Sequence, residues 1–96
     1  MKVRVAPSAI ADLDEIWAYA AENASIETAE RLVDSIVHRF ALLARNPEAG
    51  RSRDDIRHGL RSFPVGNYRI YYRNERTCVR VLFVRHAARS ESKLFD

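Results

Sequence analysis

Five side chains in this sequence could together cleave a phosphodiester bond in RNA. The reaction needs a base that takes the 2′-hydroxyl proton, an acid that protonates the leaving oxygen, and cations that stabilise the charged phosphate. His86 could act as the acid or the base, and Glu48 could act as the base. Arg61, Arg69 and Arg80 could stabilise the phosphate. A simpler hypothesis competes with this one, in which His86 ends a strand and forms only a local hydrogen bond.

Basic residues gather in the second half of the chain. Residues 49–96 hold eleven of the sixteen Lys and Arg, but only five of the thirteen Asp and Glu. This asymmetry points to a polyanionic or acidic partner. The net charge of +3 and the isoelectric point near 9.4 would also permit a nucleic-acid-binding module. However, the sequence has no helix-turn-helix, zinc-ligand set or aromatic RNA-binding motif, so we expect neither direct DNA binding nor a metal site.

Length and composition predict one soluble domain that covers residues 1–96. A chain of 96 residues can bury a core without disulfides. The single cysteine, Cys78, cannot form an intramolecular disulfide and fits a reducing compartment. The N-terminus does not resemble a signal peptide, and no segment approaches the roughly 20 apolar residues that span a bilayer. We therefore expect a cytoplasmic protein with no membrane contact and no cofactor.

The apolar spacing of the first half predicts a strand and two helices. Alternation over residues 3–5 is typical of a short strand. The first helix begins near Pro7, with Ser8 as its cap, and the second begins after Ser25 and ends at Asn46-Pro47. The short connection between them predicts an antiparallel hairpin. The two apolar stripes are Ile10, Leu13, Ile16, Trp17 and Ala20, then Ala29, Leu32, Val33, Ile36, Phe40 and Leu43.

The second half predicts a three-stranded meander. Gly66-Asn67 is a two-residue hairpin signal between the first two strands. Residues 46–59 are expected to be irregular, and residues 90–96 to form a flexible tail. The predicted fold is α+β: an N-terminal strand, an α-helical hairpin and an antiparallel meander, with the helices on one face of the sheet. The predicted strands of the meander are about Leu60–Val65, Tyr68–Arg73 and Cys78–His86.

The turns predict which side chains share a face of the sheet. A turn centred on Glu75-Arg76 pairs Tyr72 with Val79 and Ile70 with Val81. The face expected to pack on the helices carries Phe63, Val65, Tyr68, Ile70, Tyr72, Val79, Val81 and Phe83. The opposite face carries Ser62, Arg69, Tyr71, Arg73, Cys78, Arg80, Leu82, Val84 and His86. Because no helix is left to cover this second face, we expect it to bind a partner.

Several segments carry a family pattern through most of the chain. They are Ala11-Asp12-Leu13-Asp14-Glu15-Ile16-Trp17-Ala18-Tyr19, Leu42-Leu43-Ala44-Arg45-Asn46-Pro47-Glu48-Ala49-Gly50-Arg51, Gly59-Leu60-Arg61, Tyr68-Arg69-Ile70-Tyr71-Tyr72 and Val84-Arg85-His86-Ala87-Ala88-Arg89. In the order and spacing of these segments, the chain resembles the RelE/ParE superfamily of bacterial type II toxin–antitoxin toxins, and the ParE-like branch in particular. The resemblance implies a helical hairpin packed on a small, mainly antiparallel sheet.

The resemblance also implies partners. ParE-like toxins are protein inhibitors of DNA gyrase and are not themselves enzymes, whereas RelE-like toxins are endoribonucleases that cut messenger RNA in the ribosome. Either kind is neutralised by an antitoxin, here expected to be ParD-like with a ribbon-helix-helix start. Operator DNA would then be bound only through the antitoxin. A third possibility is an inactive homologue that acts only in operon autoregulation.

Two groups of residues follow as candidate binding sites. The end of the last strand is the expected target-binding region, with Arg85, His86 and Arg89. The residues expected to contact the antitoxin are Arg69, Tyr71, Arg80, Leu82, Val84 and Tyr19. The chain departs from the ParE pattern near this end, because Phe83 stands where relatives have Arg, and Arg85 where they have an aliphatic residue. Ala87 and Ser90 also depart, since relatives have Gly and Asp there.

Overall fold

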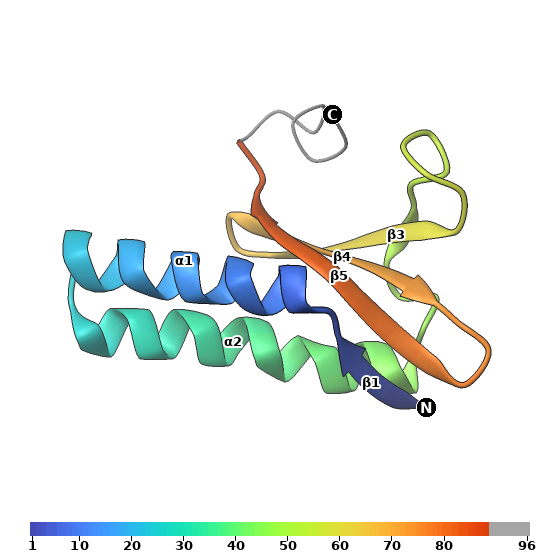
Figure 1. Cartoon of the computed structure of the whole chain (residues 1–96), viewed down its shortest axis with the longest axis horizontal. Helices are drawn as coiled ribbons and strands as arrows, with labels where there is room; N and C mark the ends of the chain where they lie inside the picture. Colours follow the sequence, from blue (N-terminus) through green and yellow to red (C-terminus); the bar gives the residue numbers. More distant parts are fainter. Residues whose placement is uncertain (89–96) are drawn as a thin grey trace.

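The chain begins with strand β1 (Lys2–Val5), followed by helices α1 (Pro7–Asn23) and α2 (Ile26–Arg45). The two-residue strand β2 (Arg51–Ser52) leads to β3 (Leu60–Val65), β4 (Tyr68–Asn74) and β5 (Cys78–His86). These elements are seen in a computed structural model, which describes residues 1–88 (Figure 1). The predicted order of a strand, a helical hairpin and a three-stranded meander is confirmed.

The five strands form one mixed sheet in the order β1-β5-β4-β3-β2. β1 runs parallel to β5, with Val5 opposite Val81, and the other neighbours are antiparallel. β2 lies within the segment that was expected to be irregular, and it pairs with Arg61 and Ser62 of β3. The last strand within residues 1–88 therefore lies inside the sheet rather than at its edge.

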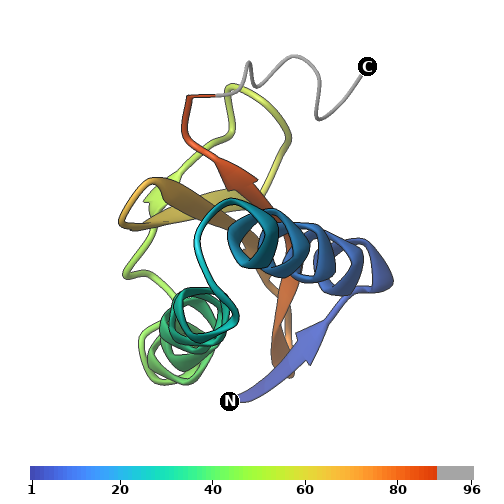
Figure 2. The same cartoon turned by 90° about the vertical axis from the view of Figure 1, so that its left-hand side faces the viewer.

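Both helices pack on one face of the sheet, as Figure 2 shows from the end of the hairpin. Ser25 caps α2 as expected, because its hydroxyl accepts the Thr28 N–H at 3.0 Å. Ser8 does not cap α1, since Ala6 holds the N-cap position and makes no side-chain bond there. Within residues 1–88, neither helix has the length and apolar character that crossing a membrane requires.

The core lies between the hairpin and the central strands. On α1 the buried positions differ from the predicted stripe: Ile10 is 50% exposed, whereas Asp12 is buried. Trp17 is half-buried and donates from its ring N–H to Glu30. The stripe of α2 is confirmed. The buried cluster consists of Ala9, Ile16, Ile36, Phe40, Leu43, Val65, Ile70, Tyr72, Val79, Val81 and Val84.

The predicted register of β4 on β5 is wrong. Tyr72 lies opposite Val81 rather than Val79, and a bulge follows, so that Tyr71 lies opposite Phe83. The bulge gives β5 one extra residue, Leu82, and a one-residue insertion reverses which face every later side chain occupies. Val84 therefore lies in the core, where Phe83 was expected.

The sheet face opposite the helices is less open than predicted. Leu60 is fully buried, Tyr71 is 1% exposed and Cys78 is 3% exposed, although all three point to this side. The segment between β2 and β3 contributes to the cover, because the Arg73 guanidinium reaches the His58 carbonyl oxygen at 3.5 Å. The expectation of an uncovered face is therefore wrong for the middle of the sheet.

A close approach at Gly50 holds the chain after α2 against β4. The Tyr72 hydroxyl accepts the Gly50 N–H at 2.8 Å and donates to the Pro47 carbonyl oxygen at 2.7 Å. Burial raises the pKa of the Tyr72 hydroxyl. A Cβ atom at Gly50 would lie 2.6 Å from that hydroxyl and 2.7 Å from the Ser62 carbonyl oxygen, so the contact requires glycine.

Candidate partner-binding surfaces

Helix α1 completes the edge of β5 where β1 ends. β1 pairs with β5 only as far as Val81, whose carbonyl oxygen accepts the Ala6 N–H at 2.8 Å. Beyond it, the Ser8 hydroxyl donates to the Leu82 carbonyl oxygen at 2.7 Å, and Asp12 accepts the Val84 N–H at 3.0 Å. Two helix side chains thus bond the strand groups that a longer β1 would have paired. Ser8 has this role instead of the predicted cap.

Asp12 is a buried carboxylate that also contacts Arg85. Its Oδ2 lies 3.2 Å from Arg85 Nε, and the two side chains are 9% and 28% exposed. Burial raises the pKa of Asp12, and the Val84 N–H and the Arg85 charge oppose that rise. The Arg85 guanidinium carbon lies 5.3 Å from the centre of the Phe83 ring.

A hollow of about 320 Å³ opens beside this ion pair, between α1 and the ends of β4 and β5. Ile16 is buried in its lining, whereas Tyr19 is 64% exposed. The His86 ring meets the Tyr68 ring edge-on at 5.2 Å. We call this site the α1–β5 hollow, and its lining residues are Asp12, Glu15, Ile16, Tyr19, Tyr68, Val84, Arg85 and His86.

The α1–β5 hollow brings together residues predicted for two different partners. Arg85 and His86 were expected to bind a target, and Tyr19 was expected to contact the antitoxin. Arg89 lies outside the described residues. Sequence reasoning did not find Asp12 or Tyr68. The spacing could have indicated Asp12, because it precedes Ile16 and Ala20 at four-residue intervals on the buried side of the helix.

His86 forms the local hydrogen bond that the simpler hypothesis expected. The Ala88 N–H donates to its Nδ1 at 3.1 Å. The other members of the ribonuclease set lie elsewhere. Arg61 donates to the Gly50 carbonyl oxygen at 2.6 Å and pairs across the sheet with Tyr72. His86 pairs with Tyr68, which is four residues from Tyr72 along β4. The strand rise therefore puts the positions of Arg61 and His86 about 13 Å apart along the sheet.

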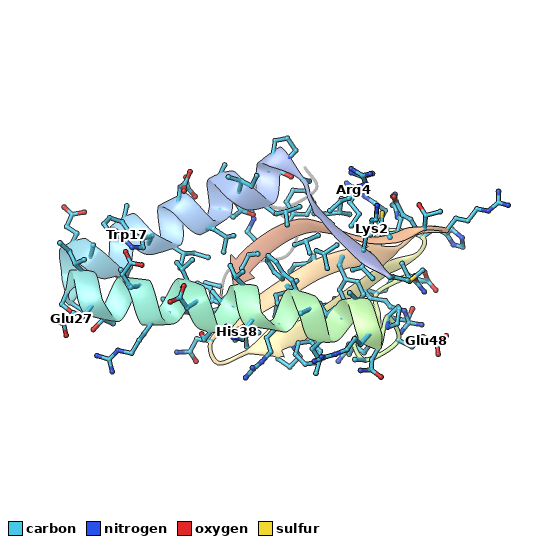
Figure 3. All side chains as sticks on the ribbon, turned by 90° about the horizontal axis from the view of Figure 1, so that it is seen from below. Lys2, Arg4, Trp17, Glu27, His38 and Glu48 are labelled. Carbon is cyan, nitrogen blue, oxygen red and sulfur yellow. The ribbon has the colours of Figure 1, made fainter. Side chains whose placement is uncertain are left out.

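Glu48 and Arg69 are separate from His86 as well. Glu48 is exposed and lines a shallow site with Met1, Arg45 and Asn74. Figure 3 places Glu48 at the end of α2 that is remote from Trp17 and Glu27. Arg69 neighbours Tyr68 on β4 and so points to the opposite face of the sheet. The described fold does not bring His86, Glu48, Arg61 and Arg69 to one place.

Three arginines surround a second hollow, of about 420 Å³, on the face opposite the helices. Arg51, Arg53 and Arg69 line it together with Ser62 and Phe63. Arg53 is buried and binds Asp55 through two hydrogen bonds, of 3.2 and 3.1 Å. The hydrogen bond from Arg53 holds the pKa of Asp55 below its usual value. We call this site the arginine hollow.

The two arginines expected to meet an acidic partner lie apart. Arg69 is in the arginine hollow. Arg80 pairs across the sheet with Arg73, which is four residues from Arg69 along β4. The strand rise puts the two positions about 13 Å apart. Arg80 also forms an ion pair with Glu75 at 3.0 Å. A partner that meets both must therefore extend along the sheet.

Three apolar candidates differ in how accessible they are. The structure buries Tyr71 and Val84, each 1% exposed, so the expectation that these two side chains lie on an open surface is wrong. Leu82 is half-buried, and its carbonyl oxygen is bonded to Ser8. Within residues 1–88, no three His, Cys, Asp or Glu side chains are placed to hold a metal ion.

Comparison with known families and proteins gives one result over almost the whole chain. The family of the ParE toxin of the type II toxin–antitoxin system parDE matches residues 3–91. Toxin ParE1 of Mycobacterium tuberculosis is 33% identical over 69 residues, which are 72% of this chain and 70% of that protein. Toxin ParE3 of Caulobacter vibrioides is 36% identical over 62 residues, 65% of this chain and 62% of that protein.

Two solved structures share the fold. A structure of the chromosomal ParDE toxin–antitoxin system of P. aeruginosa superposes with a TM-score of 0.78 and 24% identity, covering 90% of this chain and 95% of that one. A toxin–antitoxin complex, RelBE2 of Mycobacterium tuberculosis, superposes with a TM-score of 0.63 and 29% identity, covering 88% and 95%.

Proposed function

Because this chain belongs to the family of ParE toxins of type II toxin–antitoxin systems, we propose that it inhibits growth by acting on DNA gyrase and is neutralised by a cognate antitoxin. The observation that carries the proposal is the family match over residues 3–91, which spans every described helix and strand except the first residue of β1. The site of action would be the cytoplasm.

The end of β5 is the proposed gyrase-binding region. Arg85 and His86 line the α1–β5 hollow and retain partial exposure, and Arg89 follows three residues later in the sequence. Cations in a hollow with an apolar lining suit a partner that offers both acidic and apolar groups. The separation of His86 from Arg61 and Glu48 supports binding over RNA cleavage, because a general acid and base must reach the same phosphate.

The proposed antitoxin is a ParD-like protein whose acidic segment folds on this chain. Tyr19 and Leu82 offer apolar contacts, and Arg69 and Arg80 offer positive charge. A segment that orders on binding can cover such separated points, although ordering lowers its affinity per area. Operator DNA would be bound by the antitoxin, with this chain as co-repressor.

Expression without antitoxin tests the target. We expect filamentation and DNA-damage signalling while protein synthesis continues, and inhibition of supercoiling by purified gyrase. An immediate stop in translation with cleaved messages would support the endonuclease instead. His86→Ala separates the two further: catalysis predicts a loss of about 10²-fold or more, and binding predicts a graded loss. Arg39→Ala, an exposed basic position on α2, is the control.

Charge reversal tests the antitoxin surface. Arg69→Glu and Arg80→Glu should each weaken antitoxin binding, together by several kcal/mol if the partner carboxylates are desolvated. The two effects should add, because the positions lie beyond the range of direct coupling. Arg39→Glu is the matched control. Affinity that stays within about 0.5 kcal/mol in the double variant, as for charges at an interface rim, would place the antitoxin on another surface.

A further inference from the structure

One oxygen atom of Asp12 contacts two consecutive residues of β5. Oδ2 accepts the Val84 N–H at 3.0 Å and lies 3.2 Å from Arg85 Nε. The carboxylate therefore restrains both the strand backbone and the arginine side chain, at the point where the chain reaches its proposed gyrase-binding residues. Asp12 itself is held rigidly, because it lies in the middle of α1 and is buried.

In the described part of the chain, Arg85 contacts the Asp12 carboxylate and the Phe83 ring. Within residues 1–88, Asp12 is the carboxylate with which it forms an ion pair, and its buried Nε has no partner with hydrogen-bond geometry. The contact with Asp12 is therefore mainly electrostatic. A guanidinium has five N–H donors, so one carboxylate oxygen leaves most of them available to a partner at the exposed end of the side chain.

Fixing a long side chain before binding favours association. Arginine has many rotamers in solution, and ordering them at an interface lowers affinity. The negative charge of Asp12 selects rotamers that bring the guanidinium to the α1–β5 hollow. Phe83 restrains the same group from a second direction, through the ring contact at 5.3 Å.

We propose that Asp12 is the positioning residue for Arg85, holding its guanidinium at the α1–β5 hollow in the orientation that the protein target binds. The inference rests on the proposed gyrase-binding role of the end of β5. Asp12 would itself not touch the target, since its side chain is 9% exposed.

A purely structural role for Asp12 is the competing explanation, and Asp12→Asn separates the two. The amide oxygen of Asn can still accept the Val84 N–H, so the strand edge stays bonded. The neutral amide cannot form an ion pair with Arg85. Asp14→Asn is the matched control, because it makes the same change of charge at an exposed position two residues away.

The experiment measures inhibition of gyrase supercoiling by the purified full-length chain. Asp12→Asn and Arg85→Met should each raise the concentration needed for half inhibition about tenfold, the size expected for losing one hydrogen bond to a charged group. The double variant should be no weaker than Arg85→Met, because Asp12 acts through Arg85. Asp14→Asn should stay within about twofold.

Three results would overturn the proposal: full inhibition by Asp12→Asn, full inhibition by Arg85→Met, or losses that multiply in the double variant. If Asp12→Asn does not fold, Arg85→Lys replaces it, since lysine keeps the charge but lacks the planar guanidinium whose Nε lies 3.2 Å from Asp12. An unchanged Arg85→Lys variant would then contradict the inference.

A second measurement separates this inference from the gyrase proposal. The Arg85 Nε–H signal in NMR should exchange with solvent more slowly in the wild type than in Asp12→Asn. Equal exchange would refute the positioning role whatever the target is. Slow exchange in a wild-type protein that leaves gyrase unaffected would instead refute the gyrase proposal and leave the restraint on Arg85 in place.

Discussion

Neighbouring atoms leave no space for a side chain at Gly50. The Tyr72 hydroxyl and the Ser62 carbonyl oxygen occupy the space where a Cβ would lie, at 2.6 and 2.7 Å. Gly50→Ala should therefore force the chain after α2 away from β4, at a cost of about 1–3 kcal/mol, as for other overpacked sites. Thermal unfolding should show a melting temperature at least about 4 °C lower.

Tyr72→Phe provides the matched background for this prediction. Removing the hydroxyl deletes the nearest of the three obstructing atoms, together with its hydrogen bonds to Gly50 and Pro47, and leaves the Tyr72 Cε1 and the Ser62 carbonyl oxygen, both at 2.7 Å. The effects of Gly50→Ala and Tyr72→Phe should therefore be less than additive in the double variant. Full additivity would show that the Tyr72 hydroxyl does not obstruct the new methyl group.

Asp12 should give the stability a distinctive dependence on pH. Its folded-state pKa is raised above the ordinary value of 3.8, so the folded chain binds more protons than the unfolded chain just above that value. Its contribution to stability is therefore fully present below pH 3.8 and is lost as the pH rises through the folded pKa. Asp54 and Asp55, whose pKa values are lowered, have the opposite sign.

A comparison with Asp12→Asn isolates this effect. The free energy of unfolding of the wild type minus that of the variant should fall as the pH rises above 3.8, then become constant. Denaturant unfolding at a series of pH values measures the difference. A difference that grows with pH over this window would mean that Arg85 and the Val84 N–H outweigh the effect of burial.

At the scale of elements, the bulge in β5 gives Leu82 and Val84 different environments. Val84 is in the core, so Val84→Ala should lower the free energy of unfolding by about 2 kcal/mol or more. Leu82→Ala should cost clearly less, because Leu82 is only half-buried, and it should weaken antitoxin binding instead. Equal losses of stability in denaturant unfolding would contradict the register with the bulge.

The elements were predictable from the sequence, but the pairing of β4 with β5 was not. The helices and strands follow from apolar spacing and from signals such as Ser25 and Gly66-Asn67, which act locally. The bulge gives no such signal, since Leu82, Phe83 and Val84 are all apolar and fit either face. The candidate site was therefore predicted only in part: Arg85, His86 and Tyr19 converge, whereas Tyr71 and Val84 are buried.

At the scale of the molecule, the described fold is complete before the last residues of the chain. The buried cluster extends from Ala9 to Val84, and β5 ends at His86. Removal of residues 90–96, which lie outside the described residues, should leave a folded protein that binds antitoxin but is less toxic. Arg89→Ala should lower toxicity in the same way.

Thermal unfolding supplies the check on this truncation. The shortened chain should melt within a few degrees of the full chain. Burial of Leu94 and Phe95 would be worth roughly 3–6 kcal/mol by transfer estimates. If the shortened chain melts 10 °C or more below the full chain, the lost toxicity reflects unfolding rather than a lost contact with the target.

The position of β5 in the sheet has a consequence for protein synthesis. Among the strands that the structure describes, β5 is made last, yet it is the one that pairs with β1, and its residues Val79, Val81 and Val84 lie in the core. A nascent chain that ends before Cys78 therefore cannot adopt this fold. A fragment of residues 1–77 should be digested rapidly by protease, and resistance equal to that of the whole chain would disprove this dependence.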